Sequence, residues 1–383
     1  MLAVLVPLSF LGYIIACSNC HRNVFCAYAP AVVCSGIIVT IDLGGVLGIL
    51  PMTATCLLYT GLVLLAFSVY RMIRHREELH AYSILLLLLY VGCCALFWRY
   101  IRANVNTIYH YDNFSHWGII ARFLTRCNRF PSVADTDIIS FTSYPVGSAC
   151  FIYYVCHILG DDATSTMLAV QALLIFSCYF AVLTGVQRLA ADQRFRNRFA
   201  LPRLERVLPD ILYRGFHGII NAPWIETAAG ILAAGFLTFY NTELNNLLVD
   251  NLLSAAGVSA CVICFQHEQE LRKHVWELGT ILGATLAIKN SGLFLALFAL
   301  ILCLMILQDD RTRRTEERLE WQIRSGCADT AKREKLHAGY LLMIVLIPAV
   351  VFLAWKLHCS GFSASKHSMS LSAYASKLTS MSS

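Results

Sequence analysis

The stretch Ala81–Trp98, "AYSILLLLLYVGCCALFW", runs for 18 residues without a charged side chain. An α-helix rises about 1.5 Å per residue, so this stretch is nearly long enough to cross the hydrocarbon core of a bilayer, which is about 30 Å thick. A short basic segment with Arg71, Arg74 and Arg76 precedes it, and a polar loop of residues 99–148 follows it. The stretch therefore predicts a transmembrane helix that starts on the cytoplasmic side, where basic loops accumulate.

Similar apolar runs recur along the whole chain. Hydrophobic residues make up 57% of the 383 residues and charged residues 14%, whereas soluble domains carry about 25% charged residues. We expect an all-α, polytopic integral membrane protein whose partner is a lipid bilayer and not a nucleic acid, in the plasma membrane if the source is bacterial. About ten spans are predicted, near residues 1–17, 27–50, 52–70, 81–98, 163–186, 217–240, 249–266, 274–288, 291–307 and 338–357.

Three basic connections set the expected orientation of these spans. Residues 71–76 hold three arginines, residues 187–214 hold seven arginines, and residues 308–337 hold eight basic side chains. All three should face the cytoplasm, which is possible only if the apolar segment Tyr144–Gly160 does not cross. We therefore predict that this segment is an interfacial or re-entrant helix. The loop 99–148, the turn 289–292 and the tail 358–383 would then be external.

The loop contains an amphipathic segment, "DNFSHWGIIARFLTR" (Asp112–Arg126). On an α-helix, at about 100° per residue, its apolar and polar side chains fall on opposite faces, with Ile119 and Phe123 as exceptions. We predict that it lies in the membrane interface, with the apolar face toward lipid and the polar face toward a cavity. The expected apolar face consists of Phe114, Trp117, Ile120, Ala121 and Leu124, and the polar face of Asp112, Ser115, His116, Arg122 and Arg126.

The order of features in this loop points to a family. Asp112 comes soon after a span, the amphipathic helix follows, then Phe130-Pro131, and then Tyr144-Pro145 opens another helix. This order resembles the first external loop of the C-type (GT-C) superfamily of polytopic membrane glycosyltransferases, which use polyprenyl-phosphate-linked sugars. The chain departs from the family at Asn113, where many members have a second acid, and at "YPVG" (144–147), where "YPPL" is common.

The resemblance also divides the chain. Residues 81–357 hold seven predicted spans, as in the seven-span catalytic module of that superfamily. Residues 1–80 would then be extra N-terminal transmembrane helices. Residues 358–383 would be an external polar tail, and we treat the chain as a candidate fragment of a longer protein.

The resemblance implies a glycosyltransferase with Asp112 as the general base. An acceptor hydroxyl must lose a proton as it attacks the anomeric carbon, and a carboxylate at the interface can take that proton. Cations must meet the negative charge that develops on the departing phosphate. His116 and Asp250 complete the catalytic candidates. The substrate-binding candidates are Arg102, Ser115, Arg122, Tyr144, Lys289, Asn290 and Lys366.

Several of these residues have other interpretations. Asp112 could simply cap the amphipathic helix, and Asp250 could cap the next one. Lys289 could belong to a tight external turn with a snorkelling side chain. His110, Asp112 and His116 could ligate a metal, but their spacing is not typical of a metal site, so no metal or other cofactor is expected. Asp42 lies deeper in an apolar run and is left unassigned.

The expected partners are a polyprenyl-phosphate sugar donor and a glycan, lipid or protein acceptor. The alternative function is a secondary transporter or a flippase for lipid-linked sugars. Transporters tend to show inverted repeats and polar groups near the membrane midplane. Here no repeat is evident, and the polar chemistry lies at the predicted outer boundary, which favours the transferase. A purely structural membrane protein would leave the polar loop and Asp250 unexplained.

Overall fold

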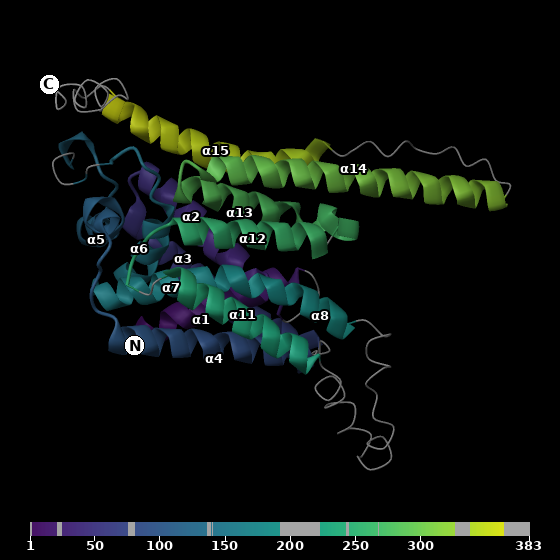
Figure 1. The fold of residues 1–383 in the computed structure, drawn as a ribbon, viewed down its shortest axis with the longest axis horizontal. Helices are drawn as coiled ribbons and strands as arrows, with labels where there is room; N and C mark the ends of the chain where they lie inside the picture. The colour runs from purple at the N-terminus through teal and green to yellow at the C-terminus, as the bar shows by residue number, and fades with distance from the viewer. Residues whose placement is uncertain are drawn as a thin grey trace, which may run out of the picture.

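The computed structural model describes residues 2–20, 25–75, 81–135, 139, 141–191, 223–242, 245–266, 268–325 and 338–363, and every regular element in these ranges is helical, as predicted (Figure 1). The α-helices are α1 (Leu2–Asn19), α2 (Ala29–Val46), α3 (Leu50–His75), α4 (Ala81–Asn104), α5 (Gly118–Cys127), α6 (Gly147–Leu159), α7 (Thr164–Tyr179), α8 (Leu183–Ala191), α11 (Trp224–Thr242), α12 (Asp250–Gln266), α13 (Val275–Ile288), α14 (Gly292–Ser325) and α15 (Ala338–Ser363). Short π or 3₁₀ turns cover Asn113–Trp117, Val133–Asp135, Phe180–Val182 and Glu268–His274.

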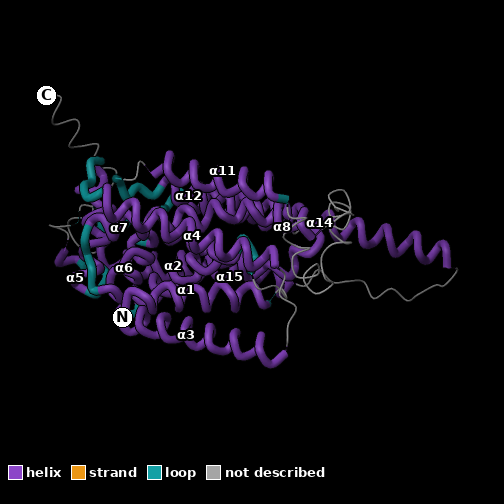
Figure 2. The backbone as a smooth tube through the Cα atoms, turned by 90° about the horizontal axis from the view of Figure 1, so that it is seen from below, coloured by secondary structure: helices purple, strands orange, loops and turns teal. Residues whose placement is uncertain are grey.

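Within the described ranges, five helices are long and apolar enough to cross a membrane. They cover Ala29–Val46, Leu50–Arg74, Tyr82–Asn104, Thr164–Ala190 and Gly292–Asp309. Shorter apolar helices cover Val4–Asn19, Gly147–Leu159, Trp224–Tyr240, Asp250–Gln266 and Ile344–Ser360. Most of these helices lie roughly alongside one another in a single bundle (Figures 1 and 2).

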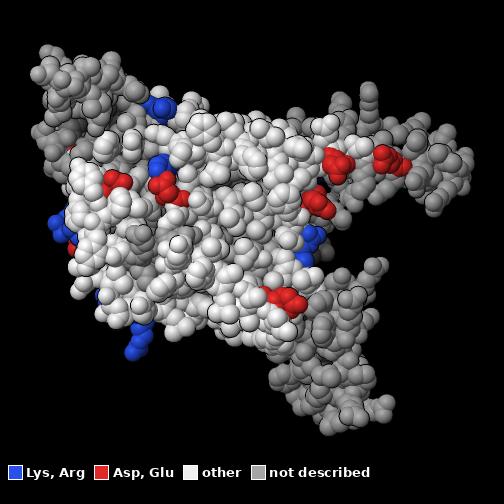
Figure 3. All heavy atoms as spheres, viewed as in Figure 1, with Lys and Arg blue, Asp and Glu red and all other residues white. Residues whose placement is uncertain are grey.

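The bundle has protein-covered helices at its centre and exposed apolar helices at its edge. The protein buries 89% of the apolar stretch of α7 with α8 and 72% of that of α2. It buries only 22% of the apolar stretch of α3 and 17% of that of α4. Exposed Phe67, Leu88 and Leu96 on α3 and α4 are large apolar side chains that water would not favour. In Figure 3 the charged side chains lie toward the two ends of the visible face, with an uncharged belt between them. This distribution suits a helix bundle surrounded by lipid.

Small residues let two helices of the bundle touch along their backbones. A Cβ atom added at Gly12 in α1 would collide with the carbonyl oxygen of Gly61 in α3, and one added at Gly61 would collide with Ser9. Close approach through small residues is the usual way that helices pack in membranes, where apolar side chains gain little by leaving lipid.

The ends of the helices sort into two groups. α3, α8 and α14 finish at the same end of the bundle, next to the three basic connections (Figure 1). α3 includes residues 71–75 of the first connection and α14 includes residues 308–325 of the third, whereas residues 192–214 of the second and 326–337 of the third lie outside the described residues. The opposite end carries the loop between α4 and α7, the start of α12 and the turn from α13 to α14. We call this opposite end the loop end.

α6 enters and leaves at the loop end, as predicted for Tyr144–Gly160. Just before α6, the carbonyl oxygen of Ser143 accepts a hydrogen bond from Trp355 Nε1 near the end of α15, at 3.2 Å. Just after α6, Asp161 pairs with Arg102 in the last turn of α4. The 13 residues of α6 span only about 20 Å. The helix therefore dips into the bundle without crossing it.

The apolar face of the amphipathic segment does not meet lipid as predicted. Trp117, Ile120, Ala121 and Leu124 are buried in the protein, because α5 packs against α6. Only Phe114 of the expected lipid-facing group is exposed, at 59%. The apolar face of the amphipathic segment thus packs against α6 instead of lipid, and this packing holds the loop on the bundle.

Candidate functional site

A π-helical turn shapes the loop beside Asp112. The turn covers Asn113–Trp117, and the backbone N–H of Gly118 donates to the carbonyl oxygen of Asn113, five residues back. A π turn inserts one extra residue, so the side chains after it rotate away from the positions that a regular α-helix gives. Ser115 and His116 were predicted on the polar, cavity-facing side, and both are buried instead. Isolated π turns occur frequently at functional sites.

Asp112 itself is open to solvent. Its side chain is 53% exposed, and it makes no capping hydrogen bond to the turn that it precedes. Its backbone N–H donates to His110 Nδ1 at 3.2 Å, and that nitrogen lies 3.8 Å from the carboxylate. Ser115 Oγ donates weakly, at 3.4 Å, to the carbonyl oxygen of Asp112 and leaves the carboxylate free. The carboxylate is therefore accessible to a ligand, and the capping interpretation is wrong.

Asp250 and Lys289 form an ion pair at the loop end. Lys289 Nζ donates to Asp250 Oδ1 at 2.6 Å, with Asp250 in the first turn of α12 and Lys289 directly after α13. Lys289 is extended and leads with Asn290 into a tight turn, in which the N–H of Gly292 donates to the carbonyl oxygen of Lys289 at 2.8 Å. Gly292 is required because a Cβ atom there would collide with the backbone of Thr285. Lys289 therefore begins a tight turn, as one interpretation predicted, and its ammonium pairs with Asp250 at the same time.

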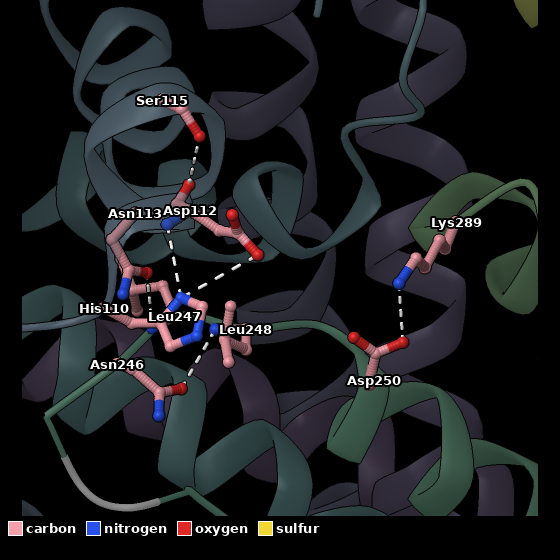
Figure 4. A network of polar contacts seen from close by, with 9 residues as sticks. All are labelled: His110, Asp112, Asn113, Ser115, Asn246, Leu247, Leu248, Asp250 and Lys289. Atoms are coloured by element: carbon pink, nitrogen blue, oxygen red, sulfur yellow. Dashed lines mark hydrogen bonds and ion pairs between the residues drawn. The ribbon is translucent and has the colours of Figure 1, made fainter.

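One hydrogen bond ties the Asp112 turn to this pair. Asn113 Oδ1 accepts the backbone N–H of Leu247 at 2.8 Å, and both residues are buried (Figure 4). Leu247 lies three residues before Asp250, so the two are at most about 10 Å apart along the chain. In Figure 4 the carboxylate of Asp112 extends to the side on which Asp250 and Lys289 lie. The fold thus gathers three charged candidates from distant parts of the sequence.

Arginines from the loop hold the α6–α7 connection. Arg102 pairs with Asp161 and also donates to Thr166. Arg122 Nη2 donates to Thr164 Oγ1 at 2.9 Å. Two of the four cations predicted to meet the phosphate, Arg102 and Arg122, therefore have partners in α7 or directly before it. In a parallel contact, Arg126 Nε pairs with Asp162 at 2.5 Å. We call these contacts the arginine latch.

The latch favours the ionised form of Asp161. Burial alone would raise the pKa of this carboxyl, but hydrogen bonds from Thr166 and Arg102 outweigh it and hold the pKa below its ordinary value. Nothing in the local sequence indicates this pairing, because Arg102 and Asp161 are 59 positions apart along the chain.

A further ion pair, between Arg129 and Asp135, stabilises the same loop and was not predicted from the sequence. Arg129 Nη1 and Nη2 donate to the two carboxylate oxygens of Asp135 at 2.7 and 2.8 Å, and the backbone N–H of Ser132 adds a bond of 2.7 Å. The guanidinium of Arg129 holds the pKa of Asp135 well below its usual range. A bidentate pair of this kind fixes geometry as well as adding energy.

His116 lies in an aromatic cluster. Its ring centroid is 4.5 Å from that of Trp117, 5.4 Å from Tyr144 and 6.2 Å from Phe141, edge-on in each case. Only 2% of His116 is exposed, and neither ring nitrogen has a hydrogen-bond partner among the described residues. Burial lowers the pKa of the imidazole to about 4. The catalytic candidate His116 therefore makes no hydrogen bond to Asp112, because the π turn and the aromatic rings enclose it.

The remaining candidates add little to this end of the bundle. Lys366 lies outside the described residues, and no group of three His, Cys, Asp or Glu side chains within the described ranges could hold a metal ion. Comparisons of the chain with protein-family models, with curated proteins and with solved structures gave no match. The functional interpretation therefore rests on the geometry of the loop end.

Proposed function

We propose that this chain is a multi-pass membrane glycosyltransferase. It transfers a sugar from a polyprenyl-phosphate donor to a hydroxyl of a glycan, lipid or protein acceptor on the external or lumenal face. About ten helices cross the membrane, and α5 and α6 lie at the loop end. The observation that carries the proposal is an exposed carboxylate, Asp112, tied through Asn113 to the segment that bears the Asp250–Lys289 pair.

Asp112 is the general base. A general base must lie within hydrogen-bond reach of the hydroxyl that it deprotonates, and this geometric requirement comes before its pKa. The carboxylate of Asp112 is exposed and has only His110 nearby, whereas Asp250 is neutralised by Lys289. Removal of the proton by Asp112 makes the acceptor oxygen a nucleophile, which forms the new glycosidic bond as the bond between the anomeric carbon and the phosphate oxygen breaks.

Lys289 binds the phosphate of the donor. Its ammonium is a compact charge that suits a phosphate oxygen, and its side chain is 29% exposed. The arginine latch already occupies Arg102 and Arg122. The partner of Lys289 is Asp250, three residues after the Leu247 that bonds to Asn113, which connects Lys289 to the segment held by the Asp112 turn. Asp250 holds the lysine in place when no donor is bound.

One observation favours the transporter alternative. Asp42 in α2 is buried, and neither of its carboxylate oxygens has a hydrogen-bond partner among the described residues. An acid inside an apolar span is a candidate for ion or proton movement. A lipid-extraction assay separates the two functions, because a transferase consumes the polyprenyl-phosphate sugar and a carrier only relocates it.

The direct test is Asp112→Asn in purified protein supplied with a polyprenyl-phosphate sugar and a hydroxyl acceptor. Asn keeps the shape of the side chain and removes the proton acceptor. We expect turnover to fall on the order of a hundredfold or more, with Asp112→Glu partly active. Asp309→Asn is the matched control, since Asp309 is an exposed acid near the middle of α14, where the apolar part of that helix ends, 17 residues after Gly292 at the loop end. Wild-type turnover by Asp112→Asn would remove Asp112 from catalysis and move the search to Asp250.

A further inference from the structure

The His116 cluster, meaning His116, Trp117, Phe141 and Tyr144, has a feature that folding alone does not explain. Buried polar atoms almost always have a hydrogen-bond partner, and each one that lacks a partner calls for an explanation, such as a role in catalysis or binding or an ordered water or ion. Both ring nitrogens of His116 are covered, yet nothing polar among the described residues meets them. A phenylalanine would fill the same space without this cost. The imidazole is therefore better suited to a ligand than to the resting fold.

The chemistry of the cluster limits what that ligand can be. A neutral imidazole offers one N–H donor and one nitrogen acceptor, which match the acceptor and the donor of a hydroxyl. Phe141 and Tyr144 stack at 5.0 Å and remain partly exposed, at 42% and 37%. They offer an apolar flat surface beside the imidazole. The cluster contains no charged side chain, which argues against a phosphate or a cation as its ligand.

We propose that the His116 cluster binds the sugar ring of the lipid-linked donor, an inference that rests on the proposed function. The apolar face of the ring packs on Phe141 and Tyr144, and a ring hydroxyl hydrogen-bonds with His116. The nitrogens are covered here, so the two partly exposed rings turn aside when the sugar enters. Asp112 directly precedes the π turn that carries His116, so both residues belong to one short segment of the loop. A sugar ring bound at His116 is thereby held on the same turn as the general base.

The experiment compares two lipids on the full-length chain in lipid nanodiscs. One is a polyprenyl-phosphate hexose, and the other is the same polyprenyl phosphate without the sugar. His116→Phe keeps an aromatic ring and removes both nitrogens. We expect it to bind the sugar-bearing lipid roughly three- to tenfold more weakly, the effect of one hydrogen bond between neutral groups, and to bind the sugar-free lipid as the wild type does. His157→Phe is the control, because His157 also stacks on an aromatic ring, Tyr153, but lies on α6 outside the cluster.

Each of the following results would contradict the proposal that the His116 cluster binds the sugar ring. Equal preference for the sugar-bearing lipid in wild type and His116→Phe would overturn the sugar site and leave the proposed function standing. Equal weakening of both lipids would assign His116 to the fold or to the phosphate. Failure of His116→Phe to fold would mean that the imidazole has a structural partner after all. A wild-type protein that binds neither lipid would overturn the proposed function, and this inference with it.

Discussion

The folding stability of this protein should depend on pH through His116. Burial lowers the pKa of its imidazole from 6.5 to about 4, whereas the unfolded chain keeps the ordinary value. Between these two pH values the unfolded state binds a proton that the folded state does not, so stability is full above pH 6.5 and falls as the pH drops toward 4. At about 1.4 kcal/mol per pKa unit, the complete loss is about 3 kcal/mol, of which about 2 kcal/mol has gone at pH 5.

The measurement is thermal unfolding in detergent at pH 7.5 and pH 5, on wild type and His116→Phe. We expect the melting temperature of the wild type to fall by a few degrees more than that of the variant. At pH 7.5 the variant should be at least as stable, because it no longer buries two nitrogens without partners. The acids with lowered pKa values, Asp135 and Asp161, lose their stabilising contribution only below about pH 4, outside this window.

An equal loss of stability in both proteins between pH 7.5 and pH 5 would refute this reasoning. It would mean that the imidazole is hydrated or partnered and keeps an ordinary pKa in the folded state. The result bears on the environment of His116 alone, because no substrate or membrane orientation enters the measurement.

Two further outcomes are expected. Lys289→Ala should weaken binding of polyprenyl phosphate by roughly ten- to hundredfold, the effect of losing a charge-assisted contact. Asp250→Asn frees the ammonium of Lys289 and should not weaken this binding. Unchanged affinity in Lys289→Ala would mean that the lysine serves only the turn. Cys127, in the loop predicted to be external, and Cys20, at the opposite end of the bundle, are both exposed, and each can be restored singly in a cysteine-free background. An impermeant maleimide added outside should label Cys127 and not Cys20. Labelling of Cys20 would mean that the predicted orientation is inverted.

The helices were largely predictable because each apolar run carries its own signal. α4 begins at Ala81 as predicted but continues to Asn104, past the apolar run, since helical hydrogen bonds do not end where hydrophobicity does. α14 likewise extends to Ser325 from a run predicted to end near residue 307. The re-entrant α6 was predictable only by combining its apolar sequence with the charge of distant loops. The count of about ten spans remains a prediction.

The site was less predictable because its geometry depends on long-range contacts. Asp250 and Lys289 were each selected as candidates, but their ion pair joins residues 39 positions apart. Arg102 and Arg122 were selected as phosphate ligands, and nothing in their local sequence indicates that α7 would engage them. The π turn, which buries Ser115 and His116, has no composition signal that a regular helical projection could detect.

Under the proposed function, Asn113 would explain how a single acid suffices where the glycosyltransferase family that the loop resembles often has two. Its side-chain oxygen accepts the backbone N–H of Leu247, and the residue is almost fully buried. An aspartate there could accept the same bond, but it would place a second charge in a site that offers no cation among the described contacts, at a considerable desolvation cost. The neutral amide holds the Asp112 turn to the segment just before α12 without placing a second charge there. In the proposed reaction, proton transfer then falls to Asp112, the one exposed carboxylate of the turn.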